Sequence, residues 1–215
     1  MNSSFYLPGY CDGPDNPKQE HEQHRLTKET QYFSVNEIAE PGSTLPRTMP
    51  NSEVFQEHMR ALRIRKTDTI VCYEVVGMFA VARCAAMFKY FGAENVRIMN
   101  GGLKKWLKEG RPVYKGSYMP GDGLEADGDY SYSVDDPDKF IKDITRIHQI
   151  AGSIVRGGDS QITDARGPAR FNGELPEPAG MRAGHISGSV NLPFSKFVDQ
   201  ETGCLRSDAE LREIF

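Results

Sequence analysis

The strongest constraint on the fold is an alternation of apolar runs with amphipathic stretches between residues 51 and 107. The runs Thr69–Tyr73 and Asn95–Met99 have the length and apolar content of buried strands. An alanine-rich stretch with helical character, from Phe79 to Phe91, separates them. Because a helix between two strands makes a crossover connection, we predict an α/β fold with a parallel sheet flanked by helices.

Local signals predict where these helices begin and end. Asn51 or Ser52 is a suitable cap for a helix that continues to Leu62, and Gly92 is placed to end the helix after it. Gly101-Gly102 turns the chain into a short helix that contains Trp106. Residues 7–50 are rich in proline, glycine and charge, and there we expect only a short strand at Tyr32–Val35.

A change in composition predicts two domains. Residues 115–135 contain several glycines and aspartates without apolar periodicity, so we interpret them as a linker. The linker separates an N-terminal domain, 1–114, from a C-terminal part, 136–215, that we expect to be incomplete. In the second part we expect a helix from Asp136 or Asp138 through Ile147, a short strand at Gln161–Thr163, a turn-rich segment that runs to Val190–Pro193, and a final helix near Ser207.

Bulk composition excludes several classes of function. The chain of 215 residues is 38% hydrophobic and 26% charged, with a net charge of -4 and a pI near 5.8. This balance argues against nucleic acid or an anionic membrane surface as a partner. No apolar run approaches the roughly 20 residues that span a bilayer. The start, Met1–Tyr6, has no basic segment followed by an apolar one, so we expect an intracellular protein without a secretory signal.

The cysteines predict free thiols in a reducing compartment. Four of them are widely scattered, and none forms a C-x-x-C pair. Cys11, His21 and His24 are the nearest approach to a metal-ligand cluster, but they lie in a polar segment that favours a solvated loop. We therefore expect neither a metal nor another cofactor. Cys72 and Cys84 are expected to be buried packing residues, and Cys204 a bystander in a surface turn.

Two stretches resemble the two-domain rhodanese family, which includes thiosulfate and 3-mercaptopyruvate sulfurtransferases. Residues 77–92 and 96–106 are similar to the first rhodanese-like domain, although Asn100 replaces the family's aspartate before the two glycines. The motifs within residues 163–178 and 184–194 look like the opening half of the second, catalytic domain. The resemblance implies tandem rhodanese-like domains, the second incomplete, with parallel sheets flanked by helices.

The resemblance also implies a chemistry. In this family a cysteine thiolate takes a sulfane sulfur from a donor and passes it to a thiol or to cyanide, while backbone N–H groups at a helix N-terminus stabilise the negative charge. Glu74 stands at the nucleophile position of the first-domain loop, residues 73–78, as expected for the family's inert domain. By this comparison the chain is truncated at both ends and lacks the second-domain cysteine loop, so we expect no catalytic residue in it.

The resemblance leaves two arginines as candidates for substrate binding. Arg170 matches the arginine that grips the anionic group of the donor, and Arg182 lies near the position of a second one, where Ala179 replaces the family's residue. A plain surface role is the alternative for both. Asp164 and His185 are expected to be structural, tying a strand end to the Gly-His-Ile turn.

Three functions compete at this stage. The first is sulfur transfer, with a small sulfur-containing anion and a thiol acceptor as partners. The second is an inactive structural subunit, whose uncovered domain edges are covered by a protein partner in a larger assembly. The third, a phosphatase of the related rhodanese-like group, also requires a cysteine loop, which these residues lack. Resemblance favours the mitochondrion over the cytosol.

Overall fold

The structure, a computed structural model, describes residues 2–7, 17–43, 47–75, 77–177 and 181–215. Three positions named above, Cys11, Val76 and Ala179, lie outside the described residues. The chain divides into two compact units, and one short segment of the first lies within the sequence range of the second. Unit 1 comprises Met1–Asp135 and Glu201–Cys204, and unit 2 comprises Asp136–Gln200 and Leu205–Phe215.

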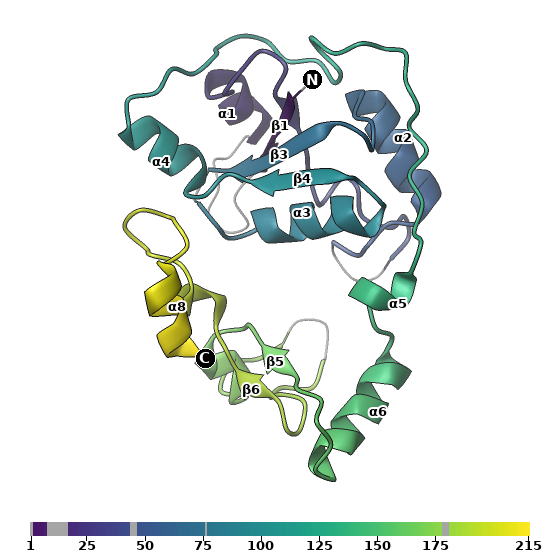
Figure 1. The fold of residues 1–215 in the computed structure, drawn as a ribbon, viewed down its shortest axis with the longest axis vertical. Coiled ribbons are helices and arrows are strands. Elements are labelled where there is room, and N and C mark those ends of the chain that lie inside the picture. Colours follow the sequence, from purple (N-terminus) through teal and green to yellow (C-terminus); the bar gives the residue numbers. More distant parts are fainter. Residues whose placement is uncertain (1, 8–16, 44–46, 76, 178–180) are drawn as a thin grey trace. The chain divides into compact units, whose positions relative to one another are not determined.

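Unit 1 is a four-stranded sheet with helices packed against it (Figure 1). Its elements in chain order are β1 (Asn2–Leu7), α1 (Pro17–Gln23), β2 (Gln31–Tyr32), α2 (Ser52–Leu62), β3 (Thr69–Glu74), α3 (Val81–Tyr90), β4 (Asn95–Ile98) and α4 (Gly102–Lys108). The strands follow the order β2-β1-β3-β4, and every neighbouring pair is parallel. The predicted α/β class with a parallel sheet is confirmed.

The alternation of side chains along β3 serves both faces of this sheet. Ile70 and Cys72 point into a large apolar cluster that also contains residues of α2 and α3. Tyr73 points the other way, into a smaller cluster with Leu103 of α4. Because both faces are covered, the central residues of β3, from Ile70 to Tyr73, have no charged side chain, as expected for a central parallel strand.

Aromatic rings hold α2 and α3 together in the larger cluster. Phe55 of α2 is fully buried, and its ring stacks on that of Phe91, with 4.1 Å between the centroids. Tyr132 meets Phe55 edge-on at 5.0 Å, and its hydroxyl donates to the carbonyl of Ile64. Residues 115–135, interpreted above as a linker, therefore contribute a side chain to the core of unit 1.

A buried arginine attaches the same segment at a second point. Arg25, 1% exposed, donates from its guanidinium to the carbonyls of Lys28, Gly116 and Ser117. Its guanidinium also lies 4.7 Å from the ring centroid of Tyr114. The hydrogen bonds to Gly116 and Ser117 are lost if residues 115–135 leave unit 1.

Unit 2 is built from short elements. In chain order they are α5 (Pro137–Phe140), α6 (Ile144–Val155), β5 (Thr163–Asp164), α7 (Pro168–Phe171), β6 (Val190–Asn191), the 3-10 helix η2 (Phe194–Lys196) and α8 (Asp208–Ile214). β5 and β6 pair in parallel as a two-stranded sheet. Ser207 and Glu210 form a capping box at the start of α8, where the sequence placed the last helix.

The structure corrects three expectations. β1 and α1 lie where no strand or helix was predicted, and the strand expected at Tyr32–Val35 is only Gln31–Tyr32. The helix expected from Asp136 onward is two helices, because Ile141 is extended and the Asp143 carboxylate accepts from the N–H of Arg146 as a new N-cap. No helix in the described part of the chain has the length and apolarity needed to cross a membrane.

Candidate functional site

The loop between β3 and α3 is a cradle of backbone N–H groups that already contains an anion. The carboxylate of Glu74, the last residue of β3, accepts hydrogen bonds from the N–H groups of Phe79 and Ala80. The two Ala80 contacts measure 3.1 Å and 2.9 Å. Ala80 is the N-cap residue of α3 and offers no side-chain cap, so Glu74 caps this helix from a distance.

Glycines give the loop its close packing. Gly77 has φ +120°, a conformation that side chains rarely adopt. Gly102 has φ +53°, and a Cβ on it would lie 2.3 Å from the carbonyl oxygen of Glu74. The turn Asn100-Gly101-Gly102 therefore packs directly against the backbone of the loop, which explains why two glycines open α4.

Burial and hydrogen bonding act on the Glu74 carboxyl in opposite directions. The side chain is fully buried, and this desolvation raises its pKa, while the donated hydrogen bonds from Ala80 and Phe79 lower it. The net effect is a raised pKa. The anion in this cradle is therefore a carboxylate, and no thiol is placed there.

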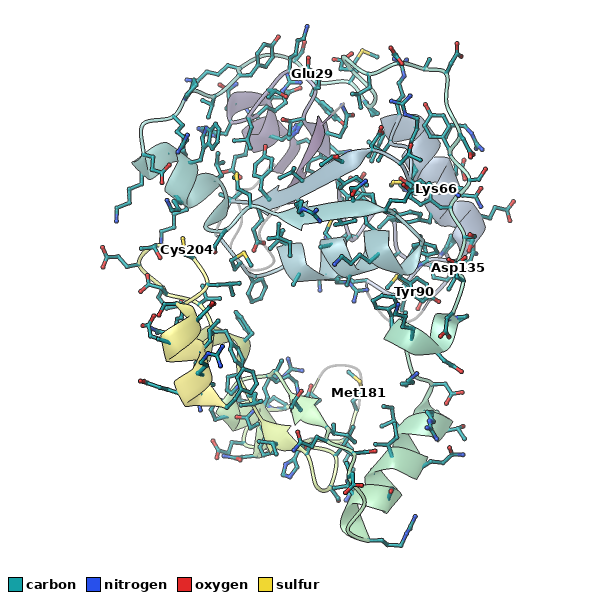
Figure 2. The ribbon with its side chains drawn as sticks, in the orientation of Figure 1. Glu29, Lys66, Tyr90, Asp135, Met181 and Cys204 are labelled. Carbon is teal, nitrogen blue, oxygen red and sulfur yellow. The ribbon has the colours of Figure 1, made fainter. Side chains whose placement is uncertain are left out.

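The three described cysteines differ in their surroundings. Cys72 and Cys84 are buried in the larger apolar cluster, and burial raises the pKa of the Cys84 thiol. Cys204 is half-buried in unit 1, where a Cβ on Gly101 would lie 2.7 Å from its sulfur (Figure 2). The packing role predicted for Cys72 and Cys84 agrees with their complete burial.

In unit 2 the candidate Arg170 lies in a network of charges. From the end of α7, its guanidinium donates to both carboxylate oxygens of Glu177. This pairing raises the pKa of Arg170 and lowers that of Glu177. The Arg170 side chain remains 42% exposed, so one edge of the guanidinium faces solvent.

Arg166 connects this pair to the end of β5. It donates to the carboxylates of Asp164 and Glu177 and, at 2.8 Å, to the carbonyl of Gly184. The hydrogen bond from Arg166 is the main reason why the pKa of Asp164 is lowered. The sequence did not predict that Arg166 and Arg170 pair with Glu177, since a turn must first bring these side chains together.

The predicted structural residue His185 lies beside this network. Its ring stacks on Phe171 with centroids 3.8 Å apart, and its Nδ1 lies 2.8 Å from the carbonyl oxygen of Phe171. Arg166 connects Asp164 to the neighbouring turn, because its guanidinium donates both to the Asp164 carboxylate and to the carbonyl of Gly184. These contacts are consistent with the structural role predicted for Asp164 and His185, which is to connect the end of β5 to the Gly-His-Ile turn.

Arg182 lines an open cavity of about 1180 Å³ within unit 2. Five other basic or acidic side chains share the lining with it: Lys142, His148, Asp164, Arg166 and His185. Arg170 is not among the residues that line this cavity. The two predicted substrate-binding arginines therefore lie in different surroundings. Arg182 lines the cavity, whereas Arg170 is paired with Glu177 outside the lining. Arg166 links the two places, because it lines the cavity and also donates to Glu177.

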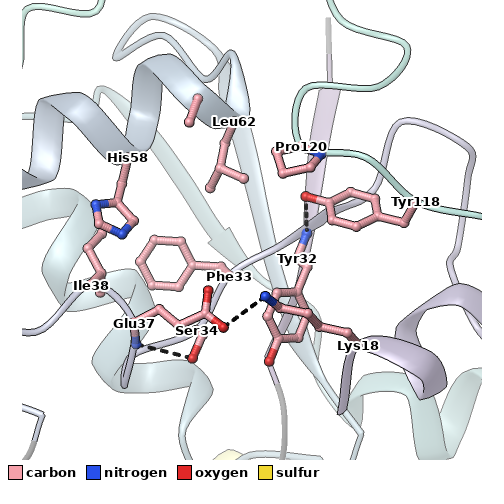
Figure 3. A pocket seen from close by; sticks show the side chains of 11 residues that line it. Lys18, Tyr32, Phe33, Ser34, Glu37, Ile38, His58, Leu62, Tyr118 and Pro120 are labelled. Carbon is pink, nitrogen blue, oxygen red and sulfur yellow. Dashed lines mark hydrogen bonds and ion pairs between the residues drawn. The ribbon is translucent and has the colours of Figure 1, made fainter. Parts of the chain in front are cut away.

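A smaller cavity of about 400 Å³ lies in unit 1 (Figure 3). Its floor is apolar, with Phe33, Ile38 and Leu62, and at its mouth the Lys18 ammonium lies 3.1 Å from the Glu37 carboxylate. The two opposite charges of this pair offset each other at the cavity. Among the described residues, no group of three His, Cys, Asp or Glu side chains is arranged to hold a metal ion.

Comparisons with known proteins match both the Glu74 loop and the chain as a whole. The model of the rhodanese-like domain matches residues 32–109, which include the Glu74 loop. Human 3-mercaptopyruvate sulfurtransferase is 30% identical over 218 residues, which cover all of this chain and 68% of the human protein. The chain belongs to the rhodanese-type sulfurtransferase family.

Other members of the rhodanese-type family extend the comparison. A mitochondrial thiosulfate/3-mercaptopyruvate sulfurtransferase of Arabidopsis thaliana is 31% identical, over 100% of this chain and 58% of the plant protein. The crystal structure of SseA from Escherichia coli, described as a 3-mercaptopyruvate sulfotransferase, superposes with a TM-score of 0.82 at 25% identity, covering 100% of this chain and 76% of SseA. The predicted rhodanese fold and family are confirmed.

Proposed function

We propose that the protein serves sulfane sulfur transfer from thiosulfate or 3-mercaptopyruvate to a thiol or cyanide, and that residues 1–215 supply donor binding without the sulfur carrier. The carrying observation is that Glu74 fills the amide cradle where the family's nucleophile stands in its active domain. Residues 1–114 are then the non-catalytic domain, 115–135 the connection, and 136–215 the opening part of the catalytic-type domain.

The basic lining of the unit 2 cavity supports the donor-binding half of this proposal. Thiosulfate and mercaptopyruvate are small anions, and the guanidinium group of Arg182 matches the paired oxygens of a sulfonate or carboxylate. Arg170 offers the same geometry, but Glu177 already occupies it. A donor must therefore share Arg170 with Glu177 or bind through Arg182 first.

The proposal is tested on purified residues 1–215. We expect no thiocyanate from thiosulfate and cyanide, and no sulfide from mercaptopyruvate, because the described thiols lack an amide cradle. Turnover abolished by Cys72→Ser or Cys204→Ser would contradict this assignment.

Donor binding is measured separately, by titrating thiosulfate at low ionic strength. Arg182→Ala should weaken binding at least fivefold, whereas Arg156→Ala, an exposed arginine outside the cavity lining, should leave it unchanged. Glu177→Gln should strengthen binding, because it releases the guanidinium of Arg170. Equal losses in the Arg182 and Arg156 variants would assign the binding to general charge and remove Arg182 from the site.

A second function, that of a structural subunit, is favoured by the apolar surface of unit 2, where Ile144 is 75% and Val155 69% exposed. One structural relative is a sub-stoichiometric sulfur transferase subunit of yeast mitochondrial complex I, with a TM-score of 0.77 at 23% identity over 100% of this chain and 74% of its own. Under this alternative a protein partner, in the mitochondrion, covers the apolar surface. Stable co-purification of the chain with a complex, without donor binding, would support it.

A further inference from the structure

Two thiols meet in the core of unit 1, directly behind the Glu74 loop. The sulfur of Cys84, in the first turns of α3, lies 3.8 Å from the sulfur of Cys72 on β3. Both side chains are fully buried. The two residues bracket the segment Tyr73–Arg83, which contains Glu74 and the amide donors that bind its carboxylate.

We propose that Cys72 and Cys84 are a modification site: an oxidisable dithiol that closes into an intramolecular disulfide and locks the Glu74 loop. A disulfide requires the sulfurs at about 2.05 Å. The two sulfurs must therefore approach by somewhat less than about 2 Å, a movement that rotation about χ1 and a small shift of α3 supply.

The oxidant is of the hydroperoxide class. The thiolate of one cysteine attacks the peroxide oxygen, which breaks the O–O bond and leaves a sulfenic acid and hydroxide. The thiolate of the second cysteine attacks the sulfenic sulfur and expels its oxygen as water. In total, two thiols and one hydrogen peroxide give one disulfide and two waters, and a dithiol reductant reverses the change.

Access to the buried pair is controlled by the Glu74 contact. α3 begins at Ala80 without a side-chain cap, so the Glu74 carboxylate holds the first turn that covers Cys84. Gly77, in the same loop, gives the backbone freedom to open. When the carboxylate releases Ala80, the first turn of α3 can open and water and peroxide reach the sulfurs.

The experiment uses the full chain with Cys11→Ser and Cys204→Ser, so that only the pair remains. After exposure to hydrogen peroxide, the intact mass should fall by two hydrogens, and alkylation in denaturant should find no free thiol until dithiothreitol is added. Peptide mapping should join the Cys72 and Cys84 peptides. The oxidised protein should melt several degrees higher, because the crosslink restricts the unfolded chain.

A matched pair of variants tests the route of access. Glu74→Gln should speed the crosslinking several-fold, because a neutral amide holds the N–H groups less strongly. Glu53→Gln, an exposed acid on α2, should have no effect. Separate oxidation of the two cysteines to sulfinic or sulfonic acids without a link, or a link that forms only in unfolded protein, would overturn the proposal. An unchanged rate in Glu74→Gln would overturn the role of the Glu74 contact.

Discussion

Unit 1 and unit 2 contain the same kinds of element, but they bury very different amounts of apolar surface. In unit 1 a four-stranded sheet is covered on both faces, and two clusters of buried side chains surround β3. Among the described residues of unit 2, only Pro193 and Val198 are buried, and Phe215 is 86% exposed. A two-stranded parallel sheet is not expected to be stable by itself, so unit 1 should dominate the cooperative unfolding of these residues.

The largest expected effect compares two phenylalanines. Phe55→Ala should lower the free energy of unfolding by about 3–5 kcal/mol, because Phe55 is fully buried against Phe91. Phe140→Ala, at a residue that is 47% exposed in unit 2, should cost less than about 1 kcal/mol. Urea unfolding followed by the fluorescence of Trp106, the only tryptophan and a residue of unit 1, measures both. Equal losses would show that the units share one core.

The next effect is a loss of folding stability at low pH that is caused by His21 of unit 1. Burial, with a contribution from Arg25, lowers the pKa of His21 to about 3 from its ordinary value of 6.5. Between these values the unfolded state binds a proton that the folded state does not, so stability is full above about pH 6.5 and falls as the pH drops toward 3. The loss should be about 1.4 kcal/mol per pH unit.

The same urea transitions, repeated at several pH values between 4 and 7, check this dependence. His21→Gln should remove the part of the pH dependence of the unfolding free energy that His21 causes. Carboxyl groups such as Glu74, whose raised pKa acts in the opposite direction, contribute equally to both proteins and cancel when the two are compared. Parallel curves for the two proteins would show that His21 titrates normally.

The smallest effect compares two helix caps of the same geometry. Asn51 accepts from the N–H of Val54 at the start of α2, and Asp143 accepts from that of Arg146 at the start of α6. Asn51→Ala should lower the stability reported by Trp106 by about 1 kcal/mol, and Asn51→Asp should retain it. Asp143→Ala should reduce helix content with little change in the Trp106 transition. A shift of similar size for both would place α6 in the cooperative core.

The sequence predicted the parts of unit 1 whose local signals agree with their final surroundings. Asn51 caps α2, the apolar run from Thr69 becomes β3, and the glycines before Trp106 open α4, all as expected. β1 was not predicted because Asn2-Ser3-Ser4 has no strand-like pattern, and its place comes from pairing with both β2 and β3. Such pairing is a property of the whole sheet, not of six residues.

The candidate sites show the same limit. The position of Glu74 in the loop was predicted because it directly follows a strand that the apolar pattern identifies and because it stands at a fixed position of the family motif. The pairing of Arg166 and Arg170 with Glu177 depends on the intervening turn, which brings together residues seven and eleven positions apart. No pattern of residue types specifies that turn, so the engagement of Arg170 was not foreseen.

The buried guanidinium of Arg25 sets a practical limit on how unit 1 can be shortened. A polypeptide that stops at residue 114 removes the carbonyls of Gly116 and Ser117 and leaves a cation in the interior with most of its acceptors gone. Any excised form of this sheet intended for spectroscopy or crystallisation should therefore extend to about Asp135, so that Tyr132 also keeps its place against Phe55.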